Sequence, residues 1–177
     1  MAGSWLKKWQ DKPVIVRFLF TFGGLLVLFY AFYFSPLYEK FIMPGLLRFQ
    51  AGISSYILDI LGYETRVEGD TLFGERLVVS IRGGCDGVEA TALYIIAVLA
   101  LPGVLSRYKT QGILVGAALL FVLNIFRIVG LYLSGVHMPS FFEFFHLHGG
   151  VIVFMMISVV MWLLWVQWVL KKNAHQG

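Results

Sequence analysis

The sequence contains few charged residues and only one cysteine. Lys, Arg, Asp and Glu make up 14% of the 177 residues, compared with about 25% in typical soluble domains. Hydrophobic residues make up 59% of the chain and its mean hydropathy is +0.80. This composition argues against a soluble domain and against a disordered chain. The net charge of +4 includes no basic run longer than two lysines, so nucleic acid is not an expected partner.

The cysteine count limits the chemistry. Cys85 is the only cysteine, which excludes an internal disulfide framework and any metal cluster built on several cysteines. A lone cysteine serves either as a small packing residue or as a reactive thiol.

Apolar runs long enough to cross a bilayer dominate the chain. About 20 apolar residues span the hydrocarbon core as a helix. Four predicted spans cover Val14–Ser35, Val88–Leu105, Ile113–Leu133 and Val151–Leu170. We therefore predict an all-α, multi-pass membrane helix bundle, forming a single membrane-embedded domain over residues 1–177. The first run is too long for a signal-peptide core, so we interpret it as a retained span.

A fifth helical pattern, Phe41–Leu61, differs from the four spans. Its apolar residues recur at helical spacing, with polar residues at the other positions. Pro44 suits a first helical turn. This pattern favours an amphipathic helix at the membrane interface, although a helix packed among the spans could also cross.

Basic residues predict the orientation of the chain. They lie before the first span, between the second and third spans, and after the last span: Lys7, Lys8, Lys12, Arg107, Lys109, Lys171 and Lys172. Basic flanks favour the cytoplasmic side of the membrane. We therefore expect a protein of the cytoplasmic (inner) membrane with both termini in the cytoplasm. Residues 36–86 then lie on the extracytoplasmic side.

The longest polar stretch predicts a small β structure. Leu77, Val79 and Ile81 alternate with other residues in a period of two, which is typical of a strand. Val67–Leu72 is a candidate partner strand, with Gly74 near the turn. We expect an extracytoplasmic hairpin insertion over residues 63–84.

Arg127 is a charged residue within the predicted span Ile113–Leu133. An arginine in the hydrocarbon region costs roughly 2.5 kcal/mol or more and usually faces an interior site. Asn124 lies one turn earlier on the same face. Arg127 could alternatively reach the outer headgroups or form a structural tie to Glu89.

Cys85 precedes the second span. Asp86 and Glu89 have the spacing of a helix capping box. Amides at a helix start favour a thiolate, whereas the two carboxylates oppose it, so a reactive Cys85 needs a nearby cation.

Three histidines follow the third span. His146 lies just ahead of the Gly149-Gly150 entry to the last span, whereas the sequence favours surface or interfacial positions for His137 and His148. A shared metal site is conceivable, but no cysteine or carboxylate completes a familiar ligand spacing. We therefore predict no metal and no cofactor.

Cys85, Arg127 and His146 all fall on the outer side of the predicted topology, where a thiol, a cation and a base could form an acyl-transfer site.

The sequence resembles the exosortase/archaeosortase family in three motifs. These are GCDGV at 84–88, NIFRI at 124–128 and FEFFH at 142–146. The resemblance covers about residues 40–170 and suggests a compact subclass, the exosortase H type. Many members carry a small residue where this chain has Asp86.

The resemblance implies a membrane cysteine protease or transpeptidase. Its substrates would be exported proteins with a C-terminal motif, a transmembrane helix and a basic tail, and the acyl group would pass to an unknown acceptor nucleophile. It implies Cys85 as nucleophile, His146 as acid and base, and Arg127 as the stabilising cation, with His148 as the alternative histidine. Four further residues would support the site or contact substrate: Asn124, Gly84, Gly87 and, more weakly, Arg82.

Two other functions remain open at this point. The three histidines could bind haem or a metal in a non-catalytic membrane subunit. Cys85 could also be a packing residue in a membrane assembly protein.

Overall fold

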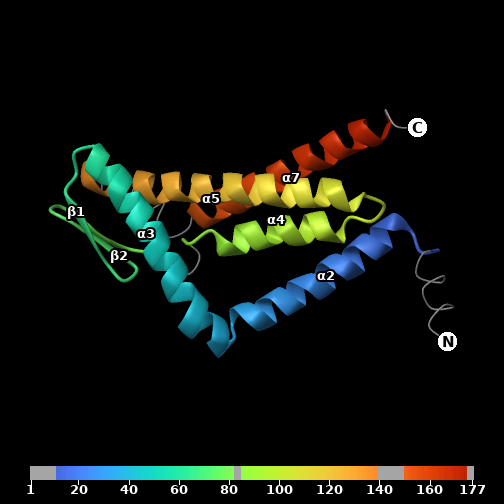
Figure 1. Ribbon diagram of the computed structural model, residues 1–177, viewed down its shortest axis with the longest axis horizontal. Helices are drawn as coiled ribbons and strands as arrows, with labels where there is room; N and C mark the ends of the chain where they lie inside the picture. The colour runs from blue at the N-terminus through green and yellow to red at the C-terminus, as the bar shows by residue number, and fades with distance from the viewer. Residues whose placement is uncertain (1–10, 82–84, 139–149, 175–177) are drawn as a thin grey trace.

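The computed structural model describes residues 11–81, 85–138 and 150–174. Six helical and three strand segments follow one another in this part of the chain (Figure 1): α2 (Val14–Tyr33), the π-helical turn η1 (Tyr38–Ile42), α3 (Met43–Ile60), β1 (Thr65–Glu68), β2 (Thr71–Gly74), β3 (Val78–Ser80), α4 (Val88–Ala100), α5 (Ser106–His137) and α7 (Gly150–Ala174).

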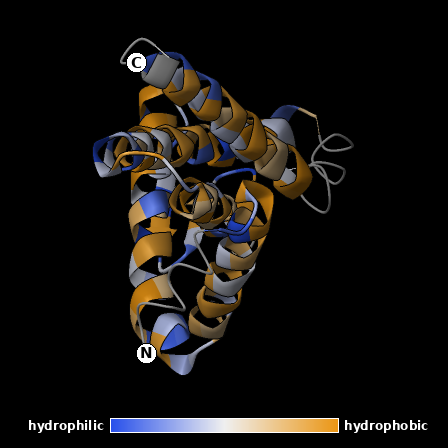
Figure 2. Ribbon diagram, turned by 90° about the vertical axis from the view of Figure 1, so that its right-hand side faces the viewer, coloured by the Kyte–Doolittle hydropathy of each residue, from blue (hydrophilic) through white to orange (hydrophobic). Residues whose placement is uncertain are grey.

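Three of these helices are long and apolar enough to cross a membrane, namely α2, α5 and α7. Large apolar side chains lie exposed on them, among them Val27 at 70% and Leu114 at 66% exposure. Figure 2 shows hydrophobic residues along these helices. Exposed apolar surface of this extent suits contact with lipid rather than water. The prediction of a helical multi-pass membrane protein is thereby confirmed.

The second predicted span is shorter than expected. The helix α4 has 13 residues and ends at Ala100, so its length is about 20 Å against a hydrocarbon core of about 30 Å. Leu101 is extended, as expected for a residue that precedes a proline, here Pro102. The structure therefore does not confirm a count of four spans.

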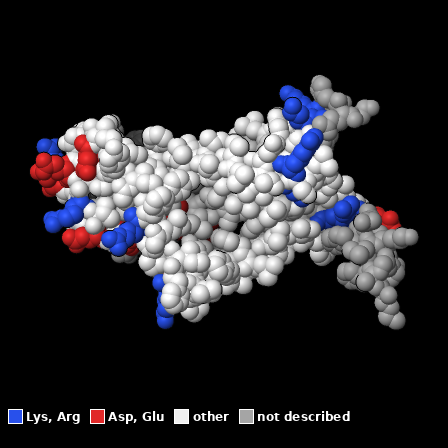
Figure 3. Space-filling view, viewed as in Figure 1, with Lys and Arg blue, Asp and Glu red and all other residues white. Residues whose placement is uncertain are grey.

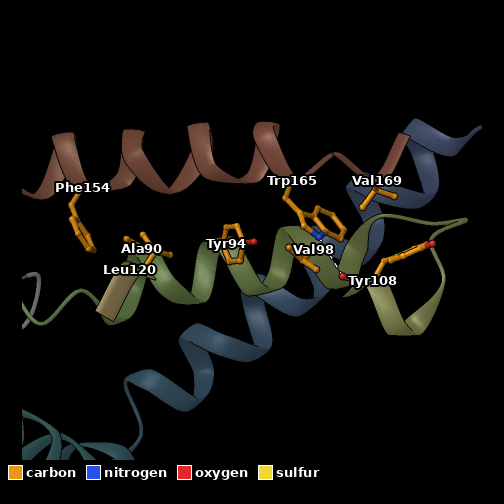
Figure 4. Close-up of a cluster of buried hydrophobic side chains, with 8 residues drawn as sticks. All are labelled: Ala90, Tyr94, Val98, Tyr108, Leu120, Phe154, Trp165 and Val169. Carbon is orange, nitrogen blue, oxygen red and sulfur yellow. Dashed lines mark hydrogen bonds between the residues drawn. The ribbon is translucent and has the colours of Figure 1, made fainter. Parts of the chain in front are cut away.

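The core of the bundle lies where α4, α5 and α7 pack together. Figure 4 shows Phe154, Trp165 and Val169 of α7 lying against α4 and the start of α5. Two polar side chains here bond to main-chain carbonyls, which lipid could not replace. Trp165 Nε1 donates to the Tyr108 carbonyl at 3.3 Å, and Ser158 Oγ donates to the Ala90 carbonyl at 2.8 Å.

The predicted helix at 41–61 is present as η1 and α3, and Pro44 lies in the first turn of α3. The apolar Phe49 and Tyr56 are exposed, whereas the polar Gln50, Ser54 and Ser55 are buried. These polar residues meet protein because α3 packs on α5 and β1. α3 is not among the helices that are long and apolar enough to span.

The polar stretch forms a three-stranded antiparallel sheet in the order β1-β2-β3. The prediction of Val67–Leu72 as one strand was wrong, because the chain turns at Gly69 and Asp70. Glu68 pairs with Thr71 across this tight turn, and Gly69 has the positive φ of 63° that such turns require. Leu72 and Val79 pair across β2 and β3 and are buried against α3 and α5.

Charged side chains gather at the two ends of the molecule and leave the middle uncharged (Figure 3). The start of α2, the turn between α4 and α5, and the end of α7 lie at one end (Figure 1). Lys12, Arg107, Lys109, Lys171 and Lys172 lie in or next to these segments. That end carries mainly Lys and Arg. The sheet lies at the opposite end, and the start of α4 lies between the two ends, on the side of the sheet.

Candidate active site

Cys85 lies between the sheet and α4. Its thiol is free and its side chain is partly buried. It packs against a cluster of buried apolar residues from α3, the sheet and α5, which includes Leu47 and Ile128. Part of the Cys85 side chain therefore packs in the core and part is accessible, which is compatible with either a structural or a reactive thiol.

The loop after Cys85 turns sharply into α4. The helix begins at Val88 with Gly87 as its cap, one residue later than expected. The Asp86 carboxylate still accepts a hydrogen bond from the Val88 amide, at 3.2 Å. The predicted capping box is incomplete, because the Glu89 carboxylate accepts a bond from the Tyr30 hydroxyl at 3.4 Å.

Gly87 is required by both conformation and space. Its φ of 70° is left-handed, a conformation that other residues rarely adopt. A Cβ atom at this position would lie 2.8 Å from Asn124 Cγ. The glycine therefore lets the start of α4 approach α5 closely.

Arg127 brings a guanidinium to the thiol. Its Nη2 lies 3.7 Å from Cys85 Sγ, although the two residues come from α5 and from the loop before α4. Its Cζ lies 5.5 Å from the ring centre of Phe154, a cation–π distance. The guanidinium therefore places a positive charge next to the sulfur, where it can stabilise negative charge that develops during a reaction.

The Asp86 carboxyl lies next to this pair and is almost fully buried, with 2% exposure. Burial raises the pKa of Asp86 above its usual value, against the lowering effects of the Val88 amide and the Arg127 charge. Burial therefore disfavours the Asp86 carboxylate relative to an exposed one, whereas the Val88 amide and Arg127 stabilise it.

Sequence reasoning missed Gln50 of α3. This buried side chain donates from Nε2 to the Asp86 carbonyl at 2.8 Å, and its Oε1 accepts from Asn124 Nδ2 at 3.4 Å. It thus links α3, the Cys85 loop and α5. The signal in the sequence was a polar stripe, with Gln50 and Ser54 at helical spacing on an otherwise apolar helix.

Several predicted site residues lie outside the described residues, namely Arg82, Gly84, His146 and His148. The structure therefore brings together Cys85, Gly87, Asn124 and Arg127 of the predicted set. His137 lies in another part of the fold, where its Nε2 shares a hydrogen bond of 2.5 Å with the Tyr63 hydroxyl. Within residues 11–81, 85–138 and 150–174, no group of three His, Cys, Asp or Glu side chains could hold a metal ion.

Comparison with known proteins adds a family assignment to this geometry. The model of the transmembrane exosortase family matches residues 14–163. The matched range includes the Cys85 loop and the whole of α5. No curated protein and no solved structure matches the chain.

Proposed function

The chain belongs to the transmembrane exosortase family, and we propose that it is a membrane cysteine protease or transpeptidase. It cleaves C-terminal sorting signals of exported, membrane-anchored proteins. The observation that carries the proposal is the 3.7 Å approach of Arg127 Nη2 to Cys85 Sγ. An arginine within an apolar helix is costly, and such residues usually serve a function.

The proposed substrate is a protein with a short C-terminal motif, a transmembrane helix and a basic tail. Its helix lies in the same bilayer as the enzyme, and its basic tail lies on the cytoplasmic side. Its scissile peptide then reaches the opposite side of the membrane. The start of α4, which follows Cys85, lies away from the three basic segments, on the side of the sheet. This arrangement supports an active site on the extracytoplasmic face.

The proposed reaction begins when the Cys85 thiolate attacks the scissile carbonyl carbon. A C–S bond forms and the carbonyl π electrons move to the oxygen. The tetrahedral intermediate then collapses, the C–N bond breaks, and the leaving nitrogen takes a proton. We assign that proton to His146, with His148 as the alternative donor. An acceptor amine, hydroxyl or water attacks the thioester, loses a proton to the same base and regenerates Cys85.

Arg127 stabilises the negative charge in this scheme. The charge lies first on the sulfur and then on the oxyanion, and a guanidinium beside Cys85 can approach both. Removal of one donor to an oxyanion typically costs about 2.7–4 kcal/mol in activation free energy. We therefore expect Arg127 to have a large effect on the rate of the chemical step.

The experiment that tests the function is cleavage of an exported reporter by the chain in membranes. The reporter carries a C-terminal motif, a transmembrane helix and a basic tail. The Cys85→Ala variant should leave the reporter uncut, and mass spectrometry of the wild type should find an acyl adduct on Cys85. Normal cleavage by Cys85→Ala would exclude the proposed chemistry.

The same assay assigns the histidine. His146→Ala should lose cleavage, and His148→Ala should retain it. The reverse result would transfer the role to His148 without removing the thiol mechanism.

A further inference from the structure

A groove opens between α3, α4 and α5, next to the Cys85 loop. Its volume is about 330 Å³ and it is open on one side. Figure 3 shows a hollow in the uncharged middle of this face, with acidic atoms deep inside it. The groove has one polar end, at Gln50, Asp86 and Asn124, and a remainder that is apolar except for Thr91.

The apolar walls follow two helices away from the loop. On α4, Val88, Ala92 and Ile95 line the groove at positions i, i+4 and i+7. Residues with this spacing share one face of a helix. On α5, Ala117 and Phe121 form the facing wall. The two alanines leave room for a side chain that enters between the helices.

The polar end contains two oxygen atoms whose hydrogen-bonding capacity is unused in the described residues. These are Asp86 Oδ2 and Asn124 Oδ1, and the two side chains are only 2% and 1% exposed. A buried polar atom without a partner costs about 1–3 kcal/mol. An occupant that supplies partners for both atoms therefore gains affinity.

Both atoms can accept a hydrogen bond. Asn124 Oδ1 is an amide oxygen, and Asp86 Oδ2 is the carboxyl oxygen that does not accept from the Val88 amide. The main-chain N–H groups of a peptide can donate to such atoms, whereas a lipid acyl chain has no donor.

We propose that this groove binds the substrate segment that joins the scissile bond to the transmembrane helix. The main chain of the segment meets Asp86 and Asn124, and an apolar side chain lies between Ala92 and Ala117. The direction of the groove supports this occupant, because it leads from the Cys85 loop along α4 and α5, as a chain that enters the membrane must. This inference rests on the proposed function for the identity of the substrate.

The first test fills the groove. Ala117→Trp places a large side chain in the groove, and Ala118→Trp places the same side chain at the neighbouring, exposed position. Ala117→Trp should reduce cleavage of a reporter that the wild type cuts by about tenfold or more, which corresponds to a binding loss of about 1.4 kcal/mol. Ala118→Trp should stay close to wild type. Equal rates in the two variants would overturn the proposal.

The second test needs neither cleavage nor a bulky substitution. In a Cys85→Ser background the chain contains no other cysteine, so Ala92→Cys, Ala117→Cys and Ala118→Cys each give one reactive position. The reporter carries one cysteine just after its scissile bond. Crosslinks from positions 92 and 117, with none from 118, support the groove. Crosslinks from 118 alone, or none from any position, would overturn it.

The two proposals fail differently. If Cys85→Ala still cuts the reporter while the groove positions crosslink, the catalytic proposal fails and the groove stands. If cleavage requires Cys85 but the groove positions do not crosslink, only the groove fails. A third measurement uses a photoactivatable phospholipid in membranes that contain the Ala117→Cys variant. If the phospholipid labels this variant equally with and without the reporter, the groove binds lipid and the proposal is overturned.

Discussion

The Gln50 amide of α3 donates a hydrogen bond of 2.8 Å to the main-chain carbonyl of Asp86, the residue after Cys85. A helix 36 residues earlier in the chain therefore fixes the loop that carries the thiol. The same side chain accepts from Asn124, so one amide holds the loop and α5 together.

Gln50→Leu should destabilise the protein and slow the reaction of Cys85. The substitution leaves the Asp86 carbonyl and the Asn124 amide without their partner, at a cost of about 1–3 kcal/mol. Thermal unfolding in detergent and the rate of cleavage measure the two effects. Ser54→Ala is the matched control, because Ser54 is buried one turn later and its hydroxyl has no hydrogen-bond partner among the described residues. Equal stability of the two variants would contradict the role of Gln50.

Gly87→Ala should be strongly destabilising. The alanine would have to adopt a left-handed φ of 70° and place its Cβ against Asn124, with a combined cost of about 2–5 kcal/mol. Thermal unfolding is again the measurement. Gly130→Ala is the control, since a Cβ there meets nothing within 4 Å and alanine is a better helix former than glycine. A tolerated Gly87→Ala would show that the start of α4 is looser than the structure indicates.

Arg127→Met should slow the alkylation of Cys85. Loss of the guanidinium 3.7 Å from the sulfur removes a charge that favours the thiolate, and we expect a decrease of about tenfold, or ~1.4 kcal/mol. Because the chain has one cysteine, uptake of a small alkylating reagent at fixed pH reports this site alone. Arg127→Lys should retain part of the rate.

The control for Arg127 is Arg107→Met, which removes a guanidinium stacked on Tyr108 at 4.6 Å, in the first turn of α5. It should leave the alkylation rate unchanged. An unchanged alkylation rate in Arg127→Met as well would show that Arg127 does not affect the reactivity of Cys85.

Asp86→Asn should change how stability depends on pH. Burial raises the pKa of the native Asp86 carboxyl, so the native state holds this proton more tightly than the unfolded state does. As pH rises from about 3.9, the unfolded state loses the proton first, and Asp86 then lowers the stability of the fold. The asparagine lacks this penalty.

Melting temperatures between pH 4 and pH 8 test this prediction. The difference between Asp86→Asn and wild type should grow in favour of the variant as pH rises. Glu68→Gln, which removes an exposed carboxyl, controls for the loss of a charge. A difference that shrinks with rising pH would mean that Arg127 keeps Asp86 ionised.

Cysteine labelling tests the proposed topology. A membrane-impermeant maleimide added to intact cells should label Cys85 but not a Cys85→Ser/Ser106→Cys variant. Ser106 is exposed at the start of α5, at the basic end of the molecule. Permeabilisation should then expose Ser106→Cys. The opposite pattern would reverse the orientation.

The sequence was sufficient to predict the helical membrane architecture, the helix after Met43 and the family. These depend on run length and on local motifs, which are visible along the chain. The approach of Arg127 to Cys85 could be expected from topology, and the structure shows it. The catalytic assignment itself stays a prediction, as does the role of His146.

Other features depend on tertiary contacts that a periodic pattern does not contain. The sequence predicted an amphipathic helix at 41–61, but not that its Gln50 and Ser55 find partners at Asp86 and Thr65. In a membrane protein, a polar stripe can face a neighbouring segment as readily as water. The sequence analysis predicted one strand at Val67–Leu72 because it did not recognise the turn at Gly69, which separates β1 from β2.

The length of α5 has a mechanical consequence. Its 32 residues extend over about 48 Å, which exceeds the hydrocarbon core of about 30 Å. Arg127 and Tyr132 therefore belong to one rigid rod, whose outer turns support the sheet through Val79 and Tyr132. A tilt of this rod in a thinner or thicker bilayer moves the guanidinium and the sheet in concert, so the pocket keeps its shape while its depth relative to the lipid headgroups changes.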